Sequence, residues 1–175
     1  IVVNDDVKLK VDEDFDFNHM EGLTIKAWYS GSKLVVCSAL EDAIYGPAYV
    51  DGNRNYIGSA RYQVAKDADL VLNDEEVEAD KFTADYAKVL LNRDNEIVWA
   101  KGYTLPYTLV VAEVKDNVAY DYNKVDASLK GYTILKEGKT ISVEDIEELD
   151  ILQYNKAEKF AIVYNDSKEG EIDRV

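Results

Sequence analysis

One stretch of sequence that occurs twice decides the expected fold. Residues 70–82 read LVLNDEEVEADKF, and residues 134–146 read ILKEGKTISVEDI, at a constant separation of 64 positions. Apolar residues match at five points, namely Leu70/Ile134, Val71/Leu135, Val77/Ile141, Ala79/Val143 and Phe82/Ile146. Self-similarity at a fixed separation is the signature of a repeated structural unit. We therefore expect the two stretches to begin two copies of one unit.

The residues of each copy predict a strand, a polar turn, one turn of helix and a hairpin. Residues 73–74 and 137–138 carry the Asn, Asp and Gly that favour turns. Ser142 and Asp145 have the spacing of a capping box, which opens a helix at its first turn. Asp85 and Asp150 each precede an apolar strand. The polar turn 92–96 then leads into Ile97, and the turn 155–159 leads into Phe160.

Strand signals also extend beyond this repeat. The 13 tyrosines and the many valines and isoleucines favour strands. Alternation along residues 86–91 predicts two faces, one with Ala87, Val89 and Leu91 and the other with Tyr86, Lys88 and Leu90. Residues 1–40 hold a looser copy that ends in a hairpin.

We predict a mainly β fold of repeated small units (strand, one-turn helix, hairpin) that form barrel- or sandwich-like subdomains. The expected division is a first subdomain at 1–102, containing a partial and a full copy, and a second at 103–175.

Composition excludes several classes of partner and site. The chain has 175 residues, with 20 Lys plus Arg against 35 Asp plus Glu, so its formal charge is −15. This charge argues against nucleic acid and against anionic membranes. A single histidine, His19, and a single cysteine, Cys37, exclude an internal disulfide framework and the usual His/Cys zinc sites. The chain begins at Ile1 without a methionine, which suggests an excised or processed piece.

The alternating acids Asp12, Asp14 and Asp16 form the candidate metal site. They resemble the start of a calcium loop, but Phe17 and Leu23 stand where an EF-hand needs Gly and Glu. A solvated acidic turn is the favoured interpretation. A looser surface Ca²⁺ site is the alternative, and no other cofactor is expected.

Aromatic residues are the candidate ligand platform, because flat rings stack on the C–H faces of sugars. The candidates are Trp28, Tyr29, Tyr45, Tyr49, Tyr56, Trp99, Tyr103 and Tyr107. Core packing and cross-strand pairing are the competing explanation for each ring.

The remaining motifs point to no reaction. Residues 138–140 end like a phosphate loop but lack its first glycine, so a turn between two strands is favoured. Paired carboxylates could serve a glycosidase, yet 35 acids make such pairs common by chance. Residues 165–167 fit a glycosylation acceptor, a short pattern that also occurs by chance. His19 has no nucleophile placed beside it by the sequence, and Cys37 fits a small buried side chain.

The segments 70–77, 85–97 and 141–146 resemble the repeated β-rich segments of bacterial surface-layer proteins. The resemblance covers residues 62–100 and 130–165, and loosely 1–40. It implies an exported location in the cell wall or surface layer, with assembly assisted by Ca²⁺. Nothing in the chain resembles the S-layer homology repeats that anchor such proteins.

Two functions follow as expectations. The first is a noncatalytic structural region of an exported surface-layer or cell-envelope protein, whose partners are neighbouring copies. The alternative is a carbohydrate-binding module for cell-wall or environmental polysaccharide. An enzyme that uses carboxylates is the third class considered, and it would need a cleft with two acids about 5–10 Å apart.

Overall fold

The computed structural model is mainly β, with 62% of residues in strands and 4% in helices, which confirms the predicted fold class. The structure describes residues 2–3, 7–8, 10–11, 21–31, 33–39, 43–51 and 54–165. Among these, no helix has the length and apolar character that crossing a membrane requires.

The first unit is a closed five-stranded barrel, which we call the barrel unit (residues 44–103). Its elements are β5 (Ile44–Asp51), β6 (Arg54–Ile57), β7 (Ala60–Leu72), β9 (Ala84–Leu91) and β10 (Glu96–Tyr103), with β8 (Glu75–Glu76) on the edge of β7. The order β9-β5-β6-β7 is a Greek key, because the fourth strand returns to lie beside the first. Parallel pairing of β10 with β7 closes the barrel.

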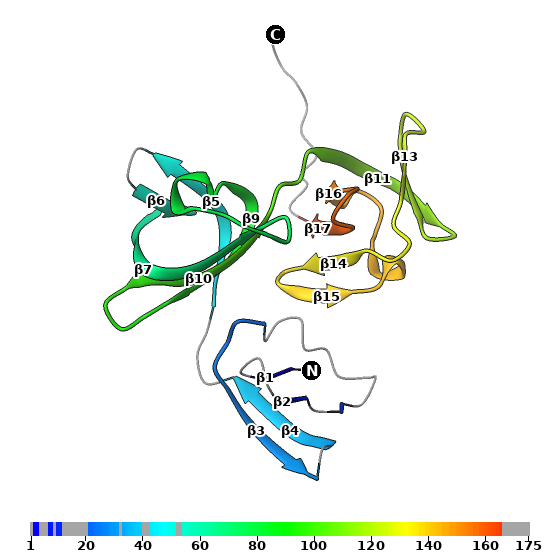
Figure 1. Ribbon diagram of the computed structural model, residues 1–175. Coiled ribbons are helices and arrows are strands. Elements are labelled where there is room, and N and C mark those ends of the chain that lie inside the picture. The colour runs from blue at the N-terminus through cyan, green and yellow to red at the C-terminus, as the bar shows by residue number, and fades with distance from the viewer. Residues whose placement is uncertain are drawn as a thin grey trace.

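The second unit is a seven-stranded sheet, which we call the open unit (residues 107–164). Its strands are β11 (Tyr107–Lys115), β12 (Val118–Asp121), β13 (Asp126–Ser128), β14 (Thr133–Lys136), β15 (Lys139–Ile141), β16 (Ile151–Asn155) and β17 (Phe160–Tyr164). The order β16-β11-β12-β13 is again a Greek key, and β17 again pairs in parallel, here with β14. Figure 1 shows the barrel unit and the open unit side by side.

The two units also share the register of their strand pairs. The matched pairs are Val71↔Glu76 and Leu135↔Thr140 at the edge strand, Asp51↔Arg54 and Lys115↔Val118 at the first hairpin, and Gly46↔Ala87 and Leu109↔Leu152 beside the returning strand. The turn at Asn73-Asp74 has two positive φ angles (51° and 59°), as has the turn at Glu137-Gly138 (53° and 76°). Such turns match the twist of a two-residue hairpin.

One detail differs from the alignment expected from the sequence. The parallel pairs Leu70↔Ala100 and Ile134↔Ala161 make Phe160 the counterpart of Trp99, not of Ile97. The reason is that the hairpin of β9 and β10 is longer than the hairpin of β16 and β17. In addition, β10 has a register shift between Ile97 and Trp99.

Each unit buries its own core around the residue that follows a single helical turn. The 3₁₀ helix η2 (Ala79–Lys81) precedes Phe82, and η3 (Val143–Asp145) precedes Ile146. Phe82 is 1% exposed within the barrel core, and Ile146 is 5% exposed within the core of the open unit. As predicted, the Asp145 carboxylate closes the start of η3, because its Oδ2 accepts from the Ser142 N–H at 2.9 Å.

Strand β9 carries the two predicted faces. Ala87, Val89 and Leu91 belong to the barrel core, whereas Tyr86 packs outward against the open unit.

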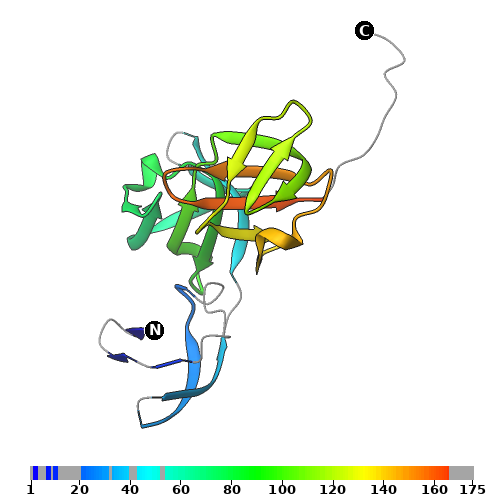
Figure 2. The same ribbon diagram turned by 90° about the vertical axis from the view of Figure 1, so that its right-hand side faces the viewer.

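The N-terminal part forms small separate sheets. Strands β1 (Val2–Val3) and β2 (Val7–Lys8) pair with each other, and β3 (Ile25–Ser30) pairs with β4 (Lys33–Ala39) as the predicted hairpin. The β3–β4 hairpin extends away from the two larger units (Figures 1 and 2). Residues 21–22, just before β3, contact the barrel.

Candidate functional site

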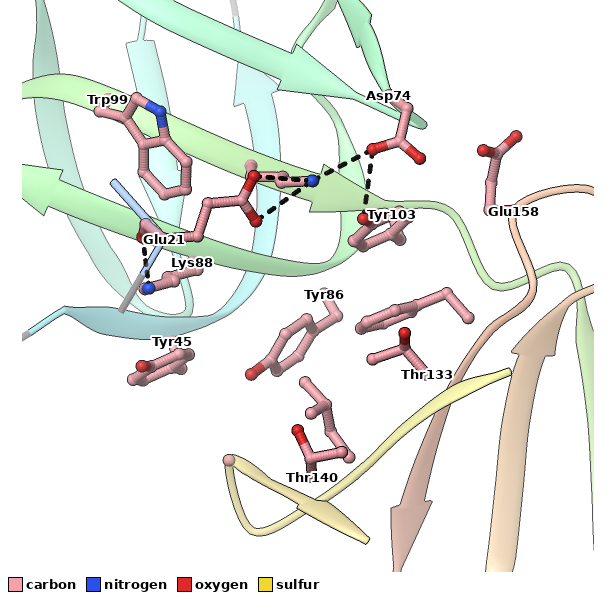
Figure 3. A pocket seen from close by; sticks show the side chains of 14 residues that line it. Glu21, Tyr45, Asp74, Tyr86, Lys88, Trp99, Tyr103, Thr133, Thr140 and Glu158 are labelled. Atoms are coloured by element: carbon pink, nitrogen blue, oxygen red, sulfur yellow. Dashed lines mark hydrogen bonds and ion pairs between the residues drawn. The ribbon is translucent and has the colours of Figure 1, made fainter. Parts of the chain in front are cut away.

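A pocket of about 230 Å³ lies where the barrel unit, the open unit and residue Glu21 meet. The barrel contributes Tyr45, Asp74, Tyr86, Lys88, Trp99, Lys101 and Tyr103, and the open unit contributes Thr133, Leu135, Gly138, Thr140, Glu158 and Phe160. Figure 3 shows these side chains converging from strands of both units. The pocket therefore exists only because the two units are packed together.

The junction beside the pocket is a small apolar core. Leu105, Phe160 and Ile162 are buried there, with Tyr86 and Tyr103 packed against them. The Phe160 ring lies 4.0 Å from the Tyr103 ring and 5.9 Å from the Tyr86 ring, measured between centroids. One side chain of the open unit thus contacts two aromatic rings of the barrel.

The linker between the units, residues 104–106, is bonded to both of them. On the barrel side, the Asn73 Oδ1 accepts from the Thr104 N–H at 2.9 Å, and the Asp85 Oδ2 accepts from the Leu105 N–H at 2.6 Å. On the other side, the Asn155 amide donates to the Thr104 carbonyl at 2.9 Å. These bonds hold the short linker in one conformation.

Glu21 and Gly22 close one side of the pocket. The Lys88 ammonium donates to the Glu21 carbonyl oxygen and lies 5.7 Å from the centre of the Trp99 ring. The Gly22 backbone lies against the same indole, since a Cβ at Gly22 would come within 2.7 Å of it. Burial lowers the pKa of Lys88 to about 8, against an opposing effect of the Glu21 charge and with a further lowering by Lys101.

Lys101 connects two acids at the pocket rim. Its ammonium lies 3.1 Å from the Glu21 carboxylate and 3.2 Å from that of Asp74. Burial alone would lower the pKa of Lys101, but the hydrogen bond to Glu21 and the nearby charges outweigh it and hold that pKa above its ordinary value. The Tyr103 hydroxyl donates to Asp74 at 3.3 Å, which completes the network.

Tyr86 lines the pocket between the residues of the two units. Among the described residues, its hydroxyl oxygen is the buried side-chain polar atom that has no hydrogen-bond partner. Burial, followed by the neighbouring Tyr45 and Tyr164, raises the pKa of Tyr86. In Figure 3 this hydroxyl is directed toward the side of the pocket where Tyr45 and Thr140 lie.

Three of the predicted aromatic residues meet in this pocket, namely Tyr45, Trp99 and Tyr103. The others lie elsewhere. Tyr49 stacks on Tyr56 at 4.8 Å, Tyr107 packs on Tyr154 at 5.3 Å, and Trp28 is 47% exposed in β3 beneath Lys26. The side chain of Tyr29 lies outside the described residues.

Several other candidates also fall outside that part of the chain. Asp12, Asp14, Asp16 and His19 lie outside it, as do the Cys37 side chain and two residues of the 165–167 motif. Within the described part, no group of three or more His, Cys, Asp or Glu side chains is arranged to hold a metal ion. Gly138 and Thr140 lie in the β14–β15 turn and strand, as favoured, and they also line the pocket.

Sequence reasoning missed four important pocket residues: Glu21, Tyr86, Lys88 and Phe160. The one available signal was a lysine and a tyrosine on the same outward face of the 86–91 strand. The lysine alone would favour an exposed face, so the pattern marks the face as mixed and does not say which distant segment covers it.

Comparison of the chain with protein-family models, with curated proteins and with solved structures found no match.

Proposed function

We propose that the chain is a noncatalytic structural region of an exported bacterial surface-layer or cell-envelope protein, serving as a rigid two-unit spacer. The observation that carries the proposal is the bonded junction. Phe160 packs on two rings of the barrel, and the linker 104–106 is hydrogen-bonded to both units. A spacer has to keep its two ends at a fixed distance and orientation, and a junction that does not bend achieves this.

The shared connectivity adds support. We infer that residues 44–103 and 107–164 are copies of one ancestral unit, because strand order, pairing register and the single helical turn recur together. Tandem β units that each bury their own core are suited to building extended structures. The strongly acidic surface suits a protein that meets its own copies through specific contacts, because like charge suppresses nonspecific ones.

Assembly of the purified chain tests this proposal. With millimolar Ca²⁺ we expect ordered two-dimensional arrays by electron microscopy. We also expect Ca²⁺ to raise the melting temperature, since a ligand that binds the folded state stabilises it. A chain that stays monomeric under these conditions would contradict the structural role.

The second candidate function is carbohydrate binding, which the junction pocket favours. Three of the aromatic residues expected to contact sugar line one cavity together with hydroxyl and carboxylate groups. Small-ligand sites combine apolar walls with a few placed polar groups in this way. A glycan array tests it, with binding of at least one saccharide expected; an array without any bound saccharide would remove this candidate.

A further inference from the structure

The buried Tyr86 hydroxyl is the feature of the pocket that calls for a ligand. A buried polar atom without a partner is costly, and natural proteins contain few of them. The Tyr86 side chain lines the junction cavity, and its hydroxyl points toward Tyr45 and Thr140, although the oxygen itself is closed to water in this structure. A ligand hydroxyl can supply the missing hydrogen bond once the neighbouring Tyr45 or Thr140 side chain moves aside.

An aromatic surface lies next to this hydroxyl. The Tyr45 side chain is 43% exposed, and its ring lies 6.2 Å from that of Tyr86 at an angle of 27°. The ring of Tyr45 is therefore held against a neighbour while much of it stays open to solvent. Such a ring offers a flat face to a ligand at low cost in conformational entropy.

The charges of the pocket favour a neutral ligand. Lys101 is already paired with Glu21 and Asp74, and Lys88 is bonded to the Glu21 carbonyl. An anionic ligand would have to displace one of these partners, and it would also approach a chain of net charge −15. A cationic ligand would face the two lysines.

The size of the pocket limits the ligand to one ring. Its volume is about 230 Å³, and drug-sized ligands occupy cavities of roughly 300–1,000 Å³. The Thr140 hydroxyl from the open unit lies on the side of the cavity toward which Tyr86 points (Figure 3). Both units therefore contribute polar groups to the same small space.

We propose that the junction pocket binds one neutral pyranose ring of a saccharide, with the sugar's C–H face on Tyr45 and its hydroxyls bonded to Tyr86 and Thr140. The inference rests on the carbohydrate-binding candidate and assigns it a site and a class of sugar. Because its ligand touches both units, bound saccharide adds contacts across the junction.

The test uses the full chain and three neutral probes: chitotetraose, cellotetraose and maltotetraose. Calorimetry is expected to detect binding of at least one of them, and amide chemical shifts are expected to change in both β5 and β15. Tetragalacturonate, which carries carboxylates, serves as the anionic comparison. We expect it to bind at least tenfold more weakly, and tighter binding would overturn the neutral assignment.

Tyr45→Ala is expected to weaken binding at least tenfold, whereas Tyr49→Ala leaves it unchanged. The two tyrosines are a matched pair, since both lie in β5 and are 43% and 44% exposed, but Tyr49 does not line the pocket. Tyr86→Phe and Thr140→Val keep the shape of each side chain and remove the hydroxyl. Each is expected to weaken binding about fivefold without lowering the melting temperature.

The outcomes distinguish a failure of carbohydrate binding from a failure of the pocket assignment. If none of the neutral probes binds and a glycan array is also empty, both the carbohydrate-binding candidate and this inference fall. If a saccharide binds but Tyr45→Ala and Tyr86→Phe retain wild-type affinity, carbohydrate binding stands and the pocket assignment is overturned. Tyr86→Phe keeps the test valid even if Tyr45→Ala fails to fold.

Discussion

The barrel unit and the open unit share one strand order but differ in their third strand. In the barrel, β7 runs for 13 residues, pairing with β6 up to Tyr62 and with β10 from Gln63 onward. In the open unit, β13 and β14 divide these pairings between them, and residues 129–132 interrupt the strand. One long strand closes a barrel, whereas the interrupted version keeps every pairing but leaves an open sheet.

A second difference concerns one acid at equivalent positions. Asp85 in the barrel accepts from the Leu105 N–H of the linker, whereas the buried Asp150 in the open unit forms an ion pair with the partly exposed Lys136 at 2.8 Å. The barrel has Leu72 where the open unit has Lys136. The same carboxylate thus holds the junction in one unit and supports the internal structure of the other.

The largest expected effect comes from removing the core residue after each helical turn. Phe82→Ala is expected to lower the free energy of unfolding by about 4 kcal/mol, and Ile146→Ala by about 3 kcal/mol, because each leaves a cavity in a packed core. Urea denaturation measures both. Tyr122→Ala, at a side chain 57% exposed, is the control and should change it by less than about 0.5 kcal/mol. A loss below about 1 kcal/mol at either core position would contradict the assignment of two separate cores.

Removal of the ion pair of the open unit is expected to have the next largest effect on the free energy of unfolding. Asp150→Asn is expected to cost about 2 kcal/mol, because the buried carboxylate loses its charge and Lys136, which is 16% exposed, loses its partner. Asp85→Asn should cost less, about 1 kcal/mol, since Asp85 is exposed and the change only weakens a hydrogen bond to a charged acceptor. The double variant Lys136→Leu/Asp150→Asn, which uses the residue found in the barrel, should regain much of the loss. A double variant no more stable than Asp150→Asn would show that the pairing is not the cause.

The interruption of the third strand contains Gly131, whose φ is +77°. Gly131→Ala is expected to cost about 1 kcal/mol, because a side chain is strained in this left-handed conformation. Lys130→Ala, next to it and exposed, is the matched control and should be neutral. Equal stability of the two variants in urea unfolding would mean that the interruption does not need glycine.

Lys88 should give the barrel unit a pH response that the open unit lacks, since Gln153 occupies the equivalent position. The folded pKa of Lys88 is about 8, below the ordinary value of 10.5. Between these pH values Lys88 binds more protons in the unfolded chain than in the folded one, so its contribution to the free energy of unfolding rises with pH. The raised pKa values of Tyr86 and Lys101 act in the opposite direction, so the wild-type protein is compared with Lys88→Gln, in which those groups remain. We expect the stability of the wild type relative to Lys88→Gln to rise by on the order of 1 kcal/mol from pH 8 to 10. A difference between the two proteins that stays constant or falls over this range would contradict the burial of the ammonium beside Glu21 and Lys101.

Local features of the fold were predictable from the sequence, while contacts between distant segments were not. Short-range rules predict the turns at 73–74 and 137–138, the capping box that begins at Ser142 and the two alternating faces of the strand at residues 86–91. Closure of the barrel depends on β7 meeting β10, and no local pattern encodes that pairing.

The candidate site shows the same limit. Tyr45, Trp99 and Tyr103 were identified by type, because flat aromatic rings suit a ligand platform. Phe160 and Thr140 join them only through the packing of the open unit on the barrel. Glu21, which also lines the pocket, belongs to a segment that precedes the first strand of the barrel. A site assembled from three parts of the chain leaves no spacing pattern in the sequence.

The central claim is that the barrel unit and the open unit form one rigid body through the junction at Phe160 and residues 104–106. Residual dipolar couplings of the backbone amides in a weakly aligned sample test it most directly. One alignment tensor should fit the amides of both units, with the orientation given by the coordinates. Two tensors of different magnitude would show units that move independently, and neither the spacer role nor a pocket built from both units would survive that result.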